Sequence, residues 1–376
     1  MDPIQPGAML GMLGGGQLGR MFTQAAQRMG YRVTVLDPDV LSPTGQIAER
    51  HLQTAYTDSE SLDVIAQTCA AVSIEFESVP AAALRALEGR VRLAPSVAAV
   101  EIAQNRILEK QFVRDAGLDT ADFASIESLD DAASAFTQIG VDCIIKTATL
   151  GYDGKGQAIC SSEGDVIAAF KQFGEVPCVL EQKIDLRTEV SVVLARSDAG
   201  EAACFPVSEN THVNGILDTS VVPAQIDDAL ASKAQSMAMS LAHTLEYVGV
   251  IGVEMFVTTD DRVLINEIAP RPHNSGHYTL DATVSSQFEQ QVRMMCGLPA
   301  SDTALTSPVV MLNLLGDVWH GAEPDWSAVV PSSAYLHLYG KAEPRPGRKM
   351  GHINVLGSNN LEALEVVHGI RQALAE

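Results

Sequence analysis

Residues 252–277, GVEMFVTTDDRVLINEIAPRPHNSGH, constrain the fold more than any other part of the sequence. Val253–Val257 and Val263–Ile268 are rich in β-branched and apolar residues, and they flank the turn-forming pair Asp260-Asp261. Two such runs joined by a short polar turn predict a β-hairpin. In a hairpin whose turn is centred on the two aspartates, the residue numbers of every opposed pair add up to the same total. The position of the turn therefore sets the register of the hairpin.

This register places Glu254 directly opposite Glu267. Side chains opposed in this way have Cβ atoms about 5 Å apart, and two carboxylates so close repel each other unless they share a proton or a cation. A hard divalent cation held by carboxylates and substrate phosphates would remove the repulsion; the alternative is a plain hairpin with two solvated acids. A dense polar run follows the second strand, formed by Arg271, His273, Asn274, Ser275 and Gly276.

The N-terminal part of the chain has the pattern of an α/β domain. Met9–Leu13, Arg32–Leu36 and Ala70–Phe76 are predicted strands, and Gly19–Met29 is a predicted helix between the first two. Strands that alternate with helices indicate a parallel sheet with helices on its faces. A predicted helix over Arg106–Ala116 ends this part of the chain.

We expect three units, at residues 1–117, 118–208 and 209–376, the last with a small β unit from about residue 308. In the second unit, predicted strands cover Cys143–Lys146, Ala158–Cys160, Val179–Gln182 and Glu189–Ala195. Residues 227–247 have a helical pattern whose apolar face is formed by Leu230, Ala234, Met237, Leu241 and Leu245. Further helices are expected near Gln287–Cys296 and Leu361–Ala375.

The chain of 376 residues has a net charge of −22. This charge argues against nucleic acid or an anionic membrane as a partner, because both require a basic face. An anionic small substrate would need a local basic patch, and the candidate is the cluster of Lys341, Arg345, Arg348 and Lys349. We see no signal peptide and no apolar run that could span a bilayer. The six scattered cysteines have no CxxC pair, which favours a cytoplasmic location and buried thiols over disulfides or a zinc site.

Gly14-Gly15-Gly16-Gln17-Leu18-Gly19 matches the GxGxxG pattern, and Asp37 ends the next strand. Such a turn brings backbone N–H groups close to a phosphate at the start of a helix. A nicotinamide or flavin site with Asp37 on the ribose is one interpretation. The others are a tight turn of the same fold without a dinucleotide, or a site for a single phosphate of another substrate.

A second glycine-rich segment, residues 151–157, follows Lys146 at the end of an apolar strand. It is not a Walker A motif, because no GK[ST] follows, but its glycines could let the backbone fold over a polyphosphate; the alternative is an ordinary flexible turn. A lysine at the end of a buried strand is costly unless it meets an anion, although it could also extend to the surface. Taken singly, Glu181 and Glu189 are more simply explained as solvated acids at a strand edge, whereas for His212 a surface position and a role in a site are equally compatible with the sequence.

Taken in order, these motifs resemble the ATP-grasp superfamily, and within it the N5-carboxyaminoimidazole ribonucleotide synthetase family. The resemblance covers nearly the whole chain. The matching segments are GGGQLGRM at 14–21, EFE at 75–77, Arg106, Lys146, GYDGKGQ at 151–157, EQ at 181–182, Glu189, NEIAPRPHNSGHYT at 266–279 and YGKAEPRPGRKMGHIN at 339–354.

The resemblance implies an α/β protein with α+β lobes, namely an ATP-grasp fold with an N-terminal Rossmann-like pre-ATP-grasp domain, a lid and a small C-terminal β unit. It also implies a homodimer. For ATP, it implies phosphate contacts from Arg106 and Lys146 and a closing loop formed by Gly151, Tyr152, Asp153, Gly154, Lys155, Gly156 and Gln157. The adenine would contact Glu181, Gln182, Lys183 and Ile184, and the rest of the nucleotide would be lined by Glu189, His212, Asn266 and Glu267.

Magnesium would be bound by Glu254 and Glu267. A third protein ligand is not expected two positions after Glu267, where many ATP-grasp enzymes have asparagine, because this chain has Ala269.

The implied reaction uses ATP, bicarbonate and 5-aminoimidazole ribonucleotide and passes through carboxyphosphate and carbon dioxide. The catalytic residues would be Arg271 on bicarbonate or carboxyphosphate, with His273 and Asn274 on the imidazole side or in transfer of the amine proton. The ribonucleotide would be bound by Gln17, Leu18, Glu75, Tyr152, Asp153, Lys341 and Arg348. A formate-dependent ligase of glycinamide ribonucleotide and a non-catalytic nucleotide-binding module remain alternatives.

Overall fold

The computed structural model of the protein describes residues 2–149, 151 and 156–375, and the strands in these ranges form three sheets. The N-terminal sheet is parallel, with strand order β3-β2-β1-β4-β5. Its strands are β1 Met9–Leu13, β2 Arg32–Leu36, β3 Arg50–Leu52, β4 Ala71–Ile74 and β5 Arg92–Leu93. The helices of this region are α1 Gln17–Arg28, α2 Ser59–Thr68, α3 Ala81–Leu87, α4 Val97–Ala103 and α5 Arg106–Asp115. The predicted parallel α/β arrangement is therefore confirmed.

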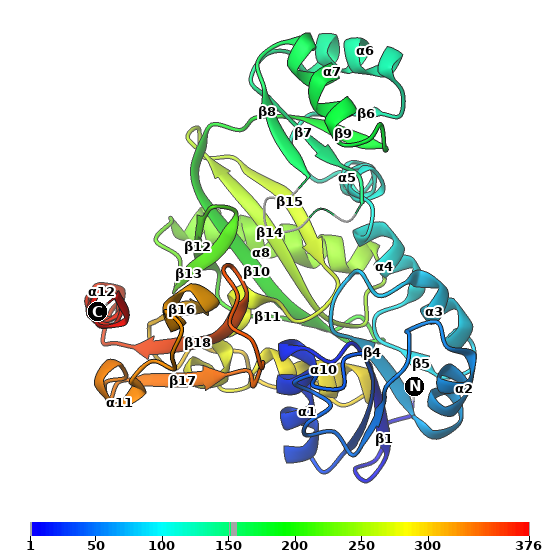
Figure 1. The fold of residues 1–376 in the computed structure, drawn as a ribbon, viewed down its shortest axis with the longest axis vertical. Helices are drawn as coiled ribbons and strands as arrows, with labels where there is room; N and C mark the ends of the chain where they lie inside the picture. Colours follow the sequence, from blue (N-terminus) through cyan, green and yellow to red (C-terminus); the bar gives the residue numbers. More distant parts are fainter. Residues whose placement is uncertain (1, 150, 152–155, 376) are drawn as a thin grey trace.

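An antiparallel sheet of order β6-β9-β7-β8 forms the part at the top of Figure 1. It consists of β6 Phe123–Ile126, β7 Cys143–Thr147, β8 Gln157–Cys160 and β9 Cys178–Gln182, with α6 Leu129–Ile139 and α7 Glu163–Gln172. One face of this sheet and the two helices share a small apolar core. The opposite face is free to line a cleft, which is the arrangement expected of a lid.

The third sheet follows the order β15-β14-β10-β12-β13-β16-β18-β17, with β11 paired to β10. Its strands are β10 Leu186–Arg196, β11 Ala202–Cys204, β12 Ser208–Val213, β13 Ile216–Val222, β14 Gly249–Thr258, β15 Val263–Ala269, β16 Val309–Leu315, β17 Ala334–Leu338 and β18 Lys349–Leu356. The three C-terminal strands therefore continue the large sheet through the β13–β16 pair rather than forming a sheet of their own.

The remaining helices cover this large sheet. They are α8 Asp228–Thr244, η1 Asn274–Gly276, α9 Thr279–Ala282, α10 Gln287–Met295, η2 Gly316–Trp319, α11 Trp326–Val329 and α12 Asn360–Ala375. The predicted apolar face of α8 is buried against β10, β14 and β15. Burial of each leucine or methionine on that face contributes roughly 1.5–3 kcal/mol. None of the described helices has both the length and the apolar character needed to cross a membrane.

Helix α10 joins the N-terminal sheet to the large sheet. Phe288 and Val292 on this helix share a core with Leu10, Phe22 and Tyr31 of the N-terminal region. In Figure 1, α10 lies beside α1 at the base of the molecule, and the lid projects away from both. The carboxyl ends of β1 and β4 are thereby held next to the β14–β15 hairpin, where the predicted site residues lie.

Candidate active site

A cleft of about 670 Å³ receives side chains from all three sheets. Most of the predicted residues line it: Gln17, Leu18, Glu75, Arg106, Lys146, Gln157, Glu181, Gln182, Lys183, Ile184, Glu189, His212, Glu254, Asn266, Glu267, Arg271, His273 and Asn274. Gly151 lines a smaller adjoining cavity of about 240 Å³. Tyr152, Asp153, Gly154 and Lys155 lie outside the described residues. Gly156 is described, with φ +71°, but it lines neither cavity.

The predicted pairing of Glu254 with Glu267 is confirmed, although by a route that the turn alone did not indicate. Near the turn, Val257 pairs with Val263, which is a register one residue away from the predicted one. A β-bulge between Glu254 and the next pair then adds one residue on β15, and that residue is Asn266. The bulge restores the predicted register, so both carboxylates enter the cleft from neighbouring strands.

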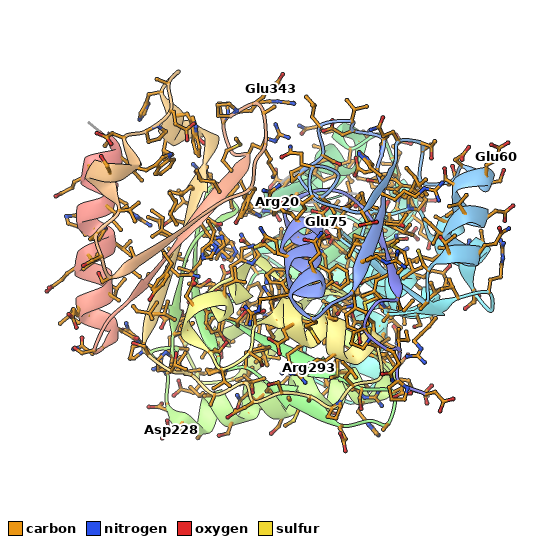
Figure 2. All side chains as sticks on the ribbon, turned by 90° about the horizontal axis from the view of Figure 1, so that it is seen from below. Arg20, Glu60, Glu75, Asp228, Arg293 and Glu343 are labelled. Atoms are coloured by element: carbon orange, nitrogen blue, oxygen red, sulfur yellow. The ribbon has the colours of Figure 1, made fainter. Side chains whose placement is uncertain are left out.

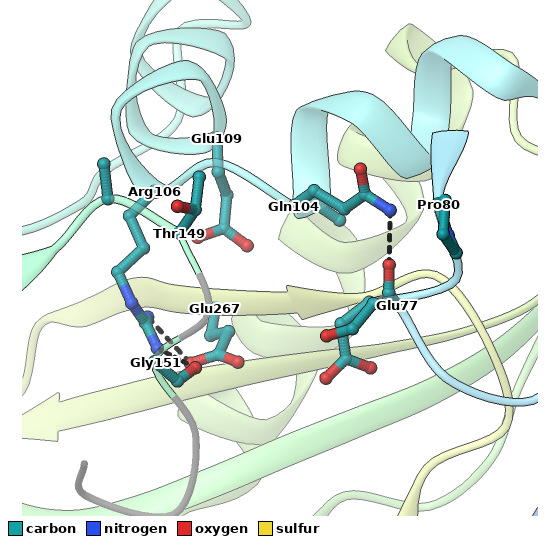
Figure 3. Close-up of a pocket in the computed structure, with 11 residues that line it drawn as sticks. Glu77, Pro80, Gln104, Arg106, Glu109, Thr149, Gly151 and Glu267 are labelled. Carbon is teal, nitrogen blue, oxygen red and sulfur yellow. Dashed lines mark hydrogen bonds and ion pairs between the residues drawn. The ribbon is translucent and has the colours of Figure 1, made fainter. Parts of the chain in front are cut away.

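Each of the two carboxylates has a cationic or hydrogen-bonding neighbour. Glu254 Oε1 lies 2.9 Å from His273 Nε2. Figure 3 shows the second pair, in which Glu267 Oε2 lies 2.9 Å from Arg106 Nη1. Burial opposes ionisation of Glu254, but the hydrogen bond from His273 outweighs burial and holds the pKa at about 2. In the same cleft, the Asn266 Oδ1 atom is buried and has no hydrogen-bond partner among the described residues. Three oxygen-bearing side chains thus converge, which suits a hard cation such as Mg²⁺.

The described residues contain no group of three or more His, Cys, Asp or Glu side chains arranged around one metal position. Ala269 pairs with Gly252 in the sheet and offers only its backbone. The carboxylates of Glu254 and Glu267 and the amide of Asn266 are therefore the side chains that fit a cation here, and the remaining ligands would come from substrate or solvent.

Glu181 is shared by two buried lysines. Its Oε2 atom lies 3.0 Å from Lys146 Nζ and 3.2 Å from Lys110 Nζ. Burial opposes ionisation of Glu181, but the charges of Lys110 and Lys146 outweigh it and lower the pKa. The other oxygen, Oε1, is buried without a partner among the described residues. It is therefore an open acceptor at the end of β9, where an amino group of a ligand could donate a hydrogen bond.

In the same cleft, His212 Nδ1 lies 2.8 Å from Glu189 Oε2. Burial acts to lower the pKa of His212, but the hydrogen bond and charge of Glu189 outweigh burial and raise it. The two residues come from adjacent antiparallel strands, β10 and β12. The cleft thus has a carboxylate–imidazole pair of the kind that binds hydroxyl groups.

Arg271 is held by a carboxylate from the N-terminal unit. Its Nε atom donates to Glu77 Oε2 over 2.6 Å. Burial opposes ionisation of Glu77, but the charge and hydrogen bond of Arg271 outweigh burial and hold the pKa at about 2. Beside them, both polar atoms of the Asn274 side chain are buried without partners among the described residues. Asn274 therefore has hydrogen-bonding capacity to spare within the cleft.

The N-terminal glycine turn is already occupied by carboxylates. Glu75 accepts hydrogen bonds from the backbone N–H groups of Gly16 and Leu18, and Asp37 Oδ2 accepts from Gly15 N over 2.7 Å. Asp37 also accepts from Tyr56 Oη over 2.7 Å. Asp37 is therefore committed to the fold, which argues against a ribose-binding acid and against the dinucleotide interpretation. Figure 2 shows Glu75 beside α1 in the middle of the molecule.

The basic cluster of the tail is divided by the fold. Lys349 lines the cleft, whereas Lys341 and Arg348 do not. Lys341 Nζ donates to the backbone carbonyl of Lys349 over 2.7 Å, and burial together with the charge of Arg348 lowers its pKa to about 8. Lys341 is nevertheless close enough for its charge to act on Glu75. Lys341 and Arg348, which the resemblance implies as ligands of the ribonucleotide, thus do not line the cleft.

Two charged side chains of the site, Lys110 and Glu77, were not predicted as site residues, and Lys349 was predicted only as a member of the basic cluster. Lys110 follows Arg106 by four residues on α5, a spacing that places both on one face of a helix. Glu77 follows Glu75 within the EFE segment. The spacing signals were present, but only tertiary contacts select these residues.

Known families match the chain in three consecutive parts. The ribonucleotide synthetase preATP-grasp domain matches residues 8–104, and the ATP-grasp domain matches residues 111–288. The phosphoribosylaminoimidazole carboxylase C-terminal domain matches residues 309–366.

Similar proteins share most of their length with this chain. N5-carboxyaminoimidazole ribonucleotide synthase from Bacillus subtilis (strain 168) is 40% identical over 94% of this chain and 92% of its own. The synthase from Brucella melitensis is 42% identical over 93% of this chain and 96% of its own.

Solved structures agree with these relatives. The ADP complex of an N5-carboxyaminoimidazole ribonucleotide synthetase has a TM-score of 0.94 and 42% identity, covering 99% of this chain and 98% of that one. The Aspergillus clavatus synthase in complex with ADP and 5-aminoimidazole ribonucleotide has a TM-score of 0.91 and 31% identity, covering 99% of this chain and 100% of that one. The chain therefore belongs to the N5-carboxyaminoimidazole ribonucleotide synthase family of the ATP-grasp superfamily.

Proposed function

We propose that this protein is an ATP-dependent carbon–nitrogen ligase that converts 5-aminoimidazole ribonucleotide to N5-carboxyaminoimidazole ribonucleotide in purine biosynthesis. The observation that carries the proposal is the single cleft in which the paired lysines on Glu181, the opposed carboxylates and the Arg271–Asn274 segment meet. The relatives from Bacillus subtilis and Brucella melitensis are named for this reaction. The solved complex with ADP and 5-aminoimidazole ribonucleotide supports the same pair of ligands here.

The nucleotide would bind between the lid and the large sheet. The unpartnered Oε1 of Glu181 would accept from the adenine amino group, and Gln182, Lys183 and Ile184 would line the base. The Glu189–His212 pair would hold the ribose hydroxyl groups, since a carboxylate and an imidazole are both suited to bind them. Arg106 and Lys146 would face the phosphates.

Magnesium would be held by Glu254, Glu267 and Asn266. When bound, it would offset the negative charge that builds up as the γ-phosphoryl group is transferred. Before binding, Arg106 and His273 hold the two carboxylates in place at 2.9 Å each. The chain itself therefore holds both acids in position before a cation binds.

For the carboxylation, bicarbonate oxygen would attack the γ-phosphorus, with ADP leaving, to give carboxyphosphate. Arg271 would grip the bicarbonate, because its guanidinium lines the cleft and is fixed by Glu77 through Nε and by the Pro272 carbonyl through Nη1. Carboxyphosphate would release phosphate and carbon dioxide, and the exocyclic amine would add to the carbon and lose a proton. Exclusion of water from the closed cleft would protect carboxyphosphate from hydrolysis.

The test is the release of inorganic phosphate from ATP with magnesium and bicarbonate, with and without 5-aminoimidazole ribonucleotide. We expect strong stimulation by this ribonucleotide and none by other amines. Arg271→Ala should abolish product formation, whereas Arg262→Ala, which removes an exposed arginine from the turn of the same hairpin, should not. Stimulation by glycinamide ribonucleotide with formate would instead support the formate-dependent ligase, and ATP binding without any hydrolysis would support a non-catalytic module.

We further propose a homodimer in the cytoplasm. Membership of the family supports the dimer, and sedimentation velocity at micromolar concentration tests it. The six cysteines are all free thiols, which is compatible with a reducing compartment.

A further inference from the structure

Three glutamines of helix α10 are completely buried, and each contacts the backbone of another segment: Gln287, Gln290 and Gln291. A buried amide is costly unless its donor and acceptor atoms have partners. Gln291 contacts Val250 N and the Ala94 carbonyl, and so joins β14 to the N-terminal unit. Gln287 contacts the segment that follows the hairpin, where the predicted catalytic residues lie.

The side-chain amide of Gln287 contacts the backbone of His273 at two points. His273 N donates to Gln287 Oε1 over 2.8 Å, and Gln287 Nε2 donates to the His273 carbonyl over 2.8 Å. Because an amide oxygen can only accept and an amide nitrogen can only donate, these two contacts fix the orientation of the amide. We call this arrangement the Gln287 clamp. It holds residue 273 by the same two backbone groups that a neighbouring β-strand would use.

The surroundings of the clamp leave little space for it to shift. A Cβ atom at Gly276 would lie 2.6 Å from Gln287 Oε1, and one at Gly252 would lie 2.6 Å from His273 Cβ. Both distances are well below the roughly 3.5 Å at which heavy atoms make favourable contact. Glycine at these two positions therefore allows the amide and residue 273 to pack closely against η1 and β14.

Helix α10 also packs against the N-terminal unit. Phe288 and Val292 share a core with Leu18 and Phe22 of α1, and Leu18 lines the cleft. Figure 1 shows α10 and α1 side by side. The helix therefore joins the part of the cleft wall that is predicted for the ribonucleotide to the segment after the hairpin.

Arg271 is held by other contacts. Its Nε atom donates to Glu77 over 2.6 Å, and its backbone N–H donates to the Ala269 carbonyl over 2.8 Å. We expect loss of the clamp to displace His273 and Asn274 while Arg271 stays in place.

We propose that Gln287 is a positioning residue that aligns His273 and Asn274 with the ribonucleotide bound against the N-terminal unit. Formation of carboxyphosphate uses Arg271 and the nucleotide residues, so it does not require the clamp. Capture of carbon dioxide by the exocyclic amine does require it, because His273 and Asn274 are the residues predicted on the imidazole side. This role rests on the proposed function, whereas the clamp itself does not.

The ratio of carbamate formed to phosphate released tests this role. Gln287→Met keeps the length of the side chain and removes both hydrogen bonds. We expect the ratio to fall by at least about 10-fold, while phosphate release and KM for ATP change by less than about 3-fold, because displaced groups capture carbon dioxide poorly. Reactions with ¹³C-bicarbonate are quenched in alkali, which slows the breakdown of a carbamate. The carbamate is then measured by ¹³C NMR and the phosphate by a colorimetric assay.

Gln290→Met is the matched control. Gln290 makes the same two contacts with the backbone of Ser301, at 2.7 and 3.3 Å, and is equally buried on the same helix. Ser301 does not line the cleft, so this variant should keep the ratio unchanged. A fall of the ratio in both variants, or in neither, would overturn the positioning role.

Gly276→Ala is the variant to use if Gln287→Met does not fold. The added Cβ atom displaces the Gln287 amide without removing it, so the ratio should again fall relative to Gln290→Met. An unchanged ratio would then overturn the proposal.

Hydrogen–deuterium exchange of the substrate-free protein tests the clamp itself. The amide of His273 should exchange at least about 10-fold faster in Gln287→Met than in the unaltered protein, because its acceptor is lost. The amide of Ser301 should respond to Gln290→Met alone. Unchanged exchange at His273 would overturn the clamp, whereas an intact clamp in a protein without ribonucleotide-stimulated phosphate release would refute the proposed function.

Discussion

At the scale of single residues, the site depends on side chains that act on other side chains. Glu181 is useful as an acceptor only because Lys110 and Lys146 both engage its Oε2 atom and leave Oε1 open. Arg271 is similarly aimed by Glu77. A charged side chain in a buried cleft needs a partner of opposite charge. Glu181 and Arg271 therefore each depend on a second residue that holds them in place and takes no part in the reaction.

The first prediction concerns Lys110. Lys110→Met should raise KM for ATP by at least about 10-fold and lower stability by about 1–3 kcal/mol, because Glu181 loses one of its two cations in a buried site. Lys171→Met, at an exposed position on helix α7 of the lid, is the control and should change neither. Steady-state kinetics and urea unfolding measure both effects. Normal ATP affinity in Lys110→Met would refute the assignment.

The second prediction concerns Glu77. Glu77→Gln keeps the shape of the side chain but removes the charge that faces Arg271 at 2.6 Å. We expect kcat to fall by about 10–100-fold with little change in KM for ATP, because a misaligned arginine loses its grip on a planar anion. Glu101→Gln breaks an exposed ion pair with Arg85 in the same unit and should be silent. An active Glu77→Gln variant would show that Arg271 does not need this partner.

At the scale of elements, helix α5 carries two side chains of the site, Arg106 and Lys110. Its start is fixed by Asn105, whose Oδ1 accepts from Ile107 N over 2.9 Å and from Leu108 N over 3.3 Å. This side chain satisfies two N–H groups that have no partner inside the helix.

Asn105→Ala should therefore lower stability by about 1 kcal/mol and also raise KM for ATP, because the first turn of α5 positions Arg106. Ser128→Ala removes a comparable cap from α6 in the lid, a helix without predicted site residues. It should lower stability by a similar amount without changing KM. Chemical denaturation and kinetics of the two variants separate the effects; equal KM values would contradict the role given to α5.

At the scale of the whole molecule, two histidines are enclosed where the C-terminal strands meet the segment after the hairpin. His277 and His352 are both fully buried, with ring centroids 4.8 Å apart. Burial, followed by the charge of neighbouring histidines, lowers the pKa of each well below its usual range. Protonation of either ring therefore opposes the packing of this part of the fold.

The sign of the resulting pH dependence follows from linkage. The pKa of His352 is lower in the folded than in the unfolded state. The contribution of its neutral ring to the free energy of unfolding is therefore fully present above about pH 6.5 and is lost as the pH falls, at about 1.4 kcal/mol per pH unit. His352→Gln should thus flatten the decline of unfolding free energy between pH 6.5 and 5, while the two curves run parallel above pH 7. Urea titrations across this range measure the difference, and identical slopes would contradict it.

The sequence by itself determined the α/β class, five of the helices and about half of the strands of the described residues, because these follow from local periodicity. The opposition of Glu254 and Glu267 was also predicted, but the register near the turn is one residue away from the predicted one and a bulge restores the pairing. The sequence also identified most residues of the cleft, because the motifs that contain them occur together and in a fixed order along the chain. It did not indicate that Asn266 forms a bulge, because a bulge depends on how β15 pairs with β14.

Only the tertiary structure decided which polar groups are paired. Glu75 occupies the glycine turn, Lys110 joins Lys146 on Glu181, and Gln287 holds the backbone of His273. Most of these contacts join residues separated by tens of positions, so no local pattern encodes them. They arise because buried polar atoms must find partners once the three sheets have packed around one cleft.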